Sequence, residues 1–132
     1  MVLYIQTIAI TFQGDFMLDS KTLITTLRTQ PNRVSFADTM AVIEVEYTFQ
    51  PSAFTNGKQI NQENENNGSC KIFAFAKLHE LNVDETLHLF GDYYRQDVLE
   101  QPTGQDHQNI RQFIECGWDG IHFSHSALTP KK

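Results

Sequence analysis

The chain has 132 residues, of which 40% are hydrophobic and 20% are charged, and it contains ten Phe residues and one Trp. This length and apolar content suffice for one domain with its own core and are too small for two ordinary domains. The composition excludes a mostly disordered chain, and no apolar run reaches the roughly 20 residues of a membrane-spanning helix. The net charge of −6 argues against nucleic acid and anionic membranes as partners, because both are bound chiefly through positive charge.

The first residues, 1–16, form an apolar extension without the charged leader and cleavage site of a signal peptide. Helix signals begin only after this extension, and Met17 is an alternative start. We therefore expect an extension over 1–16 and a single domain over 17–132. Without a secretory signal, Cys70 and Cys116 are expected as free thiols in a reducing cytoplasm.

Two helices are expected in the first third of the domain. Asp19 is placed to cap the first helix, which Pro31 ends. Ser35 and Asp38 fit a capping box that begins a second helix over about 36–46. Alternating apolar residues then predict extended chain.

A small hairpin and a buried helix are expected next. The Asn56-Gly57 pair predicts the turn of a hairpin over about 52–61, because a type I′ turn needs φ > 0 at both central positions. The polar loop over 61–68 contains no residue expected in the core. Ser69 is placed to cap a helix over about 69–81, which is apolar on nearly every side and is therefore expected to be the central helix.

The last third of the chain predicts two more helices and a short strand. Asn82 is placed to cap the first of them, and Gly91 is a candidate interruption. Asp106 is placed to cap the last helix, Gly117 ends it, and 121–123 is a strand candidate. The expected fold class is therefore α+β and mainly helical, with four or five helices around the central one, a small hairpin and short edge strands.

Several segments resemble the HopJ family of type III effector proteins. They are 38–43, 66–76, 89–95 with 97–99, 106–111 followed by 117–118, and 128–130. The resemblance extends over about 17–132 and implies a single HopJ-like domain. It also implies a bacterial effector-like protein or a housekeeping homologue, cytoplasmic or delivered into a host cell by type III secretion. No reaction or catalytic residue is carried over with it, so the chemistry has to be argued from the residues.

Cys70 is the first candidate for chemistry. At the first turn of a helix, unpaired N–H groups would lower the pKa of a thiol and favour the thiolate. The Gly-Ser-Cys sequence ending there is also similar to the start of the central helix in papain-type cysteine peptidases. His107 as base, with Asn109 or Asp106 as orienting residue, would complete a catalytic set. Lys71 stands where that family has an aromatic residue, and the competing interpretation is a small core residue.

A second group of residues is expected to bind a partner. They are Asn64, Asn66, Asn67, Gly68, Ser69, Asp92, Tyr93, Arg95 and Asp106. The first five offer amide donors at a helix start, and the others combine charged groups with a phenol. The competing interpretations are a solvated loop and a surface helix whose Tyr rings pack inward. No metal site is expected, since His122 and His125 would point to opposite faces of a strand.

Two functions fit these residues. The leading hypothesis is a protein-binding module that contacts a protein partner through the polar loop and the following helix start, without cofactor, nucleic acid or membrane. The alternative is a small Cys-dependent hydrolase or thiol enzyme. They differ in whether Sγ of Cys70 is accessible and within hydrogen-bond reach of an imidazole. The oligomeric state is left open.

Overall fold

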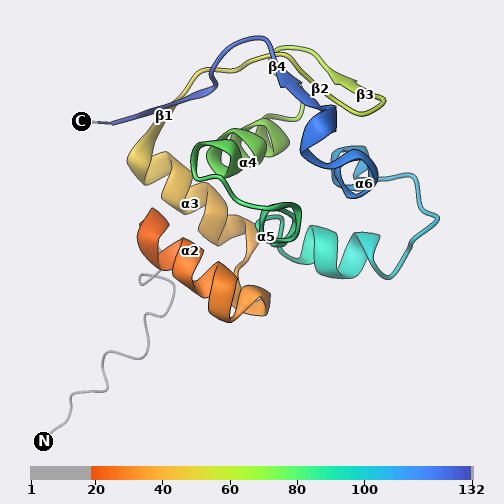
Figure 1. The fold of residues 1–132 in the computed structure, drawn as a ribbon, viewed down its shortest axis with the longest axis horizontal. Coiled ribbons are helices and arrows are strands. Elements are labelled where there is room, and N and C mark those ends of the chain that lie inside the picture. The colour runs from red at the N-terminus through yellow and green to blue at the C-terminus, as the bar shows by residue number, and fades with distance from the viewer. Residues whose placement is uncertain (1–18, 132) are drawn as a thin grey trace, which may run out of the picture.

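The computed structural model describes residues 19–131, so the expected extension over 1–16 lies outside the described residues. The elements in chain order are α2 (Ser20–Thr29), the 3-10 turn η2 (Pro31–Arg33), α3 (Phe36–Glu46), β1 (Tyr47–Phe49), β2 (Phe54–Asn56), β3 (Gln59–Asn61), α4 (Asn67–Leu78), α5 (Val83–His88), the π-helical segment η3 (Tyr93–Val98), α6 (Gln108–Cys116), the 3-10 turn η4 (Gly117–Gly120), β4 (Ile121–Phe123) and β5 (Leu128–Pro130). The expected mainly helical α+β class is confirmed, with the strands along one edge of the molecule (Figure 1).

The strands form two small antiparallel sheets. β1 pairs with β5, with Thr48 opposite Thr129. The other sheet has the order β3-β2-β4, with Thr55 of the middle strand opposite Ile60 on one side and His122 on the other. The strand expected over 121–123 is confirmed as the edge strand β4. Both sheets therefore join the middle of the chain to its last described residues.

The hairpin is present, but its turn is shifted by one residue from the expected position. Asn56 is paired with Gln59, so the two loop residues are Gly57 and Lys58. Gly57 has φ +57° and Asn56 is fully buried in the strand. The expected type I′ turn with Asn56 and Gly57 as its two central residues is thus wrong, because the side chain of Asn56 is held in a buried hydrogen-bond network.

Three of the expected helix caps are confirmed. The side chain of Asp19 accepts a hydrogen bond from the first turn of α2. Ser35 and Asp38 form the capping box of α3, whose bounds match the expected helix. Asn82 and Glu85 form a second capping box at the start of α5. These short-range hydrogen bonds satisfy N–H groups that a helix leaves unpaired.

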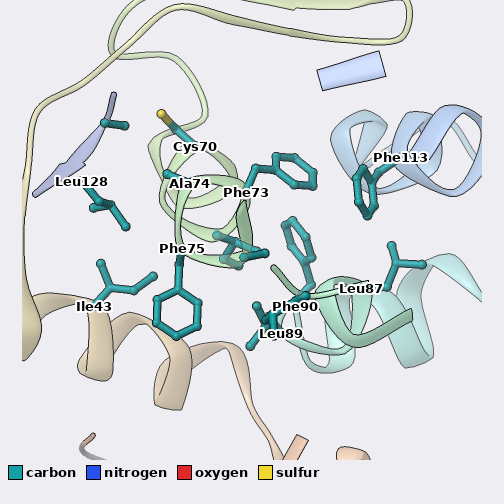
Figure 2. Close-up of a cluster of buried hydrophobic side chains, with 14 of the residues drawn as sticks. Ile43, Cys70, Phe73, Ala74, Phe75, Leu87, Leu89, Phe90, Phe113 and Leu128 are labelled. Carbon is teal, nitrogen blue, oxygen red and sulfur yellow. The ribbon is translucent and has the colours of Figure 1, made fainter. Parts of the chain in front are cut away.

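The core is built around Phe73 of α4. Its ring centroid lies 6.0 Å from that of Phe54, 5.5 Å from Phe90, 4.9 Å from Phe113 and 6.4 Å from Trp118. Figure 2 shows the rings of Phe73, Phe90 and Phe113 gathered between α4, α5 and α6. The buried hydrophobic residues form one cluster around this helix, which confirms α4 as the central helix.

The central helix begins and ends earlier than the expected 69–81. Its N-cap is Asn66, with the left-handed φ of 53°, and its last residue is Leu78. Ser69 is therefore the third residue of the helix and not its cap. After the helix, a second left-handed residue, Glu80 with φ 54°, turns the chain toward α5.

Two glycines shape the chain after α5. Gly91 interrupts the expected long helix with φ +63°, and a Cβ atom there would lie 2.6 Å from the backbone nitrogen of Phe36. Gly117 ends α6 with φ 62°, as expected. Trp118 then packs against Phe113 at a centroid distance of 5.1 Å. None of the helices between residues 19 and 131 has the length and hydropathy of a bilayer-spanning segment.

Candidate functional site

A cavity of about 500 Å³ lies between the first turns of α4 and α6. Its apolar lining comes from Phe36, Phe90, Tyr93 and Ile110, and its polar lining from Gln59, Asn66, Gly68, Ser69, Gln105, His107, Gln108 and Asn109. This volume and this mixture of rings and polar groups are typical of small-molecule sites. We take the cavity as the candidate functional site.

Both helices that border the cavity begin at a left-handed residue. Asn66 has φ 53° and His107 has φ 52°, and neither side chain accepts a hydrogen bond from the first turn that follows it. First-turn N–H groups have no partner within a helix and carry a partial positive charge. The cavity is thus bordered by two helix starts whose N–H groups are not bound by a cap side chain.

Buried asparagines join the hairpin to both helix starts. Nδ2 of Asn56 donates to Oδ1 of Asn109 at 3.0 Å, and Nδ2 of Asn61 donates to the same oxygen at 3.1 Å. Oδ1 of Asn61 accepts from Asn109 at 3.0 Å and from Asn66 at 2.8 Å. The network fixes one residue at each helix start, Asn66 and Asn109, and both residues line the cavity.

Sequence reasoning missed the buried half of this network. Asn61 was expected in an exposed loop and Asn56 in a turn, yet both are almost completely buried. The signal for Asn56 was its position two residues after Phe54, because alternate residues of a strand share one face. Nothing comparable marks Asn61, since a polar residue beside a polar loop is usually exposed.

His107 is held by two carboxylates. Its Nε2 lies 3.1 Å from Oδ2 of Asp97 and 3.8 Å from Oδ2 of Asp106. Its ring packs against that of Tyr93 at a centroid distance of 5.2 Å. The sequence predicted Asp106 as the cap of α6, but the N-cap is His107. The carboxylate of Asp106 instead binds Arg111 at 2.7 Å, and this hydrogen bond lowers the pKa of Asp106. His107 is held in this way at the wall of the cavity.

Cys70 does not have the surroundings expected of a nucleophile. Its side chain is 0% exposed, and Sγ donates to the carbonyl oxygen of Ser52 at 3.7 Å. Burial raises the pKa of the Cys70 thiol, where the sequence predicted a lowered one. Because α4 begins at Asn67, the N–H of Cys70 already bonds to the carbonyl oxygen of Asn66, and Sγ lies in the core. The prediction that Cys70 is an exposed thiolate at the start of the helix is therefore wrong.

Half of the residues expected to act or bind line the cavity. These six are Asn66, Gly68, Ser69, Tyr93, His107 and Asn109. The other six, Asn64, Asn67, Cys70, Asp92, Arg95 and Asp106, do not line it. The structure thus brings His107 and Asn109 together with the expected binding residues and separates both from Cys70. The other six lining residues were not identified as site residues: Phe36, Gln59, Phe90, Gln105, Gln108 and Ile110. Single Gln residues carry no distinctive pattern, and apolar residues at helical spacing indicate core.

Arg95 of η3 stabilises the fold by binding the chain segment that precedes α3. Its guanidinium donates to the carbonyl oxygens of Val34 at 2.6 Å and Pro31 at 3.2 Å, and it lies 3.8 Å from the carboxylate of Asp92. These bonds hold η3 against the chain before α3, and so fix the segment that carries Tyr93.

Across residues 19–131, no three His, Cys, Asp or Glu side chains gather as a metal site would require.

Comparisons with known proteins agree on the fold. The family described as HopJ type III effector protein matches residues 20–128. A solved structure, that of the unknown function protein VPA0580, is similar with a TM-score of 0.84 and 52% identity, over 86% of this chain and 94% of that one. None of the curated proteins matches the sequence. The matched residues include every residue that lines the cavity.

Proposed function

The chain belongs to the HopJ family, and we propose that it is an effector-like binding protein whose partner enters the cavity between the starts of α4 and α6. The observation that carries this proposal is the convergence of two uncapped helix starts on one cavity that also has aromatic walls. Such a site offers backbone donors and ring surface to the same ligand. The partner we expect is a protein or a group attached to one.

Binding is favoured over thiol catalysis by the position of Cys70. A nucleophilic thiol needs access to its substrate and a base within hydrogen-bond reach. Here the thiol is fully buried and bonds to Ser52, while the imidazole of His107 bonds to Asp97. The two candidate catalytic groups therefore bond to different partners and not to each other. This arrangement favours the cavity as a binding site over a site of thiol catalysis.

A fragment titration of the ¹⁵N-labelled full chain tests the binding function. The library contains neutral, anionic and peptide fragments, and the readout is the chemical shift of each backbone amide. We expect saturable shifts that cluster at Gly68 and Asn109, and the same pattern in the Cys70→Ala variant. Shifts that avoid both amides, or that vanish in Cys70→Ala while the fold is kept, would contradict the proposal.

Family membership also suggests delivery by a type III secretion system, in contrast to a housekeeping role in the cytoplasm. An epitope-tagged full chain expressed in a bacterium with a working type III apparatus is expected in the culture medium. A matched strain without the secretion ATPase is expected to retain it. Retention by both strains would favour the housekeeping alternative.

A further inference from the structure

The polar lining of the cavity is dominated by carboxamide side chains. They come from Gln59, Asn66, Gln105, Gln108 and Asn109, and no Lys, Arg, Asp or Glu is among the described residues that line the cavity. A cation would meet no carboxylate in this lining. An anion would gain only the partial charges of the two helix starts, because the imidazole of His107 is already bound to Asp97. The lining therefore favours a ligand that is polar but neutral.

Hydrogen bonds within the protein leave the carboxamides of Asn66 and Gln108 with free acceptors, whereas Oδ1 of Asn109 already accepts from Asn56 and Asn61. Nδ2 of Asn66 is bound to Asn61 at 2.8 Å, and Nε2 of Gln108 is bound to the carbonyl oxygen of Gln105 at 2.9 Å. An amide whose NH₂ is engaged in this way presents its carbonyl oxygen to a ligand. Backbone N–H groups of the two helix starts supply donors beside these acceptors. A hydroxyl group both donates and accepts, so it matches this mixture.

The aromatic wall supplies the other half of the recognition. Tyr93 is 44% exposed, and its ring centroid lies 5.1 Å from that of Phe36 in a T-shaped contact and 5.2 Å from that of His107. The face of an aromatic ring is electron-rich and attracts the weakly positive C–H groups of a ligand. A sugar ring has C–H groups on its faces and hydroxyl groups around its rim.

From this combination we infer that the cavity binds a neutral sugar, with its ring against Tyr93 and its hydroxyl groups among the carboxamides and the helix-start N–H groups. The inference rests on the proposed function, because it names the chemical group that enters the same cavity. The sugar is supplied free or as a neutral glycan attached to a partner protein.

Titration with neutral disaccharides tests the inference. The probes are maltose, cellobiose, lactose and mannobiose, added to the ¹⁵N-labelled full chain. We expect at least one to give saturable shifts at Gly68 and Asn109. Tyr93→Ala is expected to weaken this binding about fivefold, since the ring contact is worth about 1 kcal/mol. Leu99→Ala, which removes an exposed apolar side chain of the same segment outside the cavity, is expected to change affinity by less than about twofold.

A matched pair of proteins separates the two sources of the sugar. Ribonuclease B carries a neutral mannose-rich glycan, and ribonuclease A is the same polypeptide without it. Binding of ribonuclease B but not ribonuclease A supports the glycan source, and binding of free disaccharides alone supports the free sugar. If no sugar shifts the cavity amides while anionic or peptide fragments do, the sugar inference is overturned and the binding function stands. If nothing in either titration shifts them, both are overturned.

Discussion

Asn61 and Asn109 form a reciprocal pair, in which Nδ2 of each residue donates to Oδ1 of the other, at 3.1 Å and 3.0 Å. One residue ends the hairpin and the other lies in the first turn of α6. The cavity wall is therefore held by amide hydrogen bonds in a buried position, where each unpaired polar group is costly.

The Asn61→Ala variant tests this pair. It leaves polar atoms of Asn109 and Asn66 without their partner, so we expect a loss of about 1–3 kcal/mol in the free energy of unfolding. In a double-mutant cycle with Asn109→Ala, urea titration is expected to give a coupling of about 0.5–3 kcal/mol. Losses that simply add would show that the two side chains act independently.

The aromatic centre of the core gives the largest expected loss. Phe73→Ala removes a fully buried ring and is expected to lower the free energy of unfolding by about 3–5 kcal/mol. Leu78→Ala, at the exposed end of the same helix, is the matched control and is expected to cost less than about 1 kcal/mol. Denaturant titration with equal losses at both positions would contradict the central position of Phe73.

The two cysteines are expected to differ in reactivity. Cys116 is exposed, whereas Cys70 is buried and burial raises the pKa of its thiol. Iodoacetamide at neutral pH is therefore expected to modify Cys116 in the folded protein and Cys70 only in urea, as followed by mass spectrometry. Rapid alkylation of Cys70 in the folded protein, slowed by His107→Ala, would revive the thiol-enzyme alternative.

His79 links stability to pH through Tyr47. The Tyr47 hydroxyl lies 2.6 Å from Nε2 of His79, and only the neutral ring can accept its hydrogen bond. Burial lowers the pKa of His79, against a smaller opposing effect of Glu46. The unfolded chain then binds the proton more readily, so stability is present above the ordinary histidine pKa and is lost as pH falls from that value toward the lower folded pKa.

Urea titrations at about pH 7 and about pH 5 measure this loss. His79→Gln is expected to lose less stability between the two conditions than the unsubstituted chain. Part of the loss remains in that variant, because burial also lowers the pKa of His88. An equal loss in both proteins would mean that His79 does not contribute.

Local signals predicted much of the fold and less of the site. Capping residues such as Asp19 and Ser35 act over three residues, and the sequence shows such patterns directly. The starts of α4 and α6 were misplaced because Asn66 and His107 begin them in left-handed conformations that no capping pattern marks. Cys70 was misjudged for the same reason, since shifting the helix start moves its side chain into the core.

The cavity lining shows a second limit of sequence reasoning. Gln59 and Gln108 lie 49 positions apart and meet at the cavity only because the hairpin packs on α6. Tyr93 and His107 could each be identified as candidates, but the sequence did not show that their rings meet, or that Phe36 of another element packs on Tyr93. Chemistry that depends on such long-range packing has no signature in local spacing.

The strand pairing sets the order in which the chain can fold. β4 pairs with β2 and β5 pairs with β1, so neither sheet can be completed before residues 121–130 have been synthesised. Contacts between residues so far apart close slowly, because a long loop must be ordered first. While it is being made, the nascent chain can form helices and the β2-β3 hairpin, but the three-stranded sheet that contains this hairpin is completed only after synthesis has passed β4.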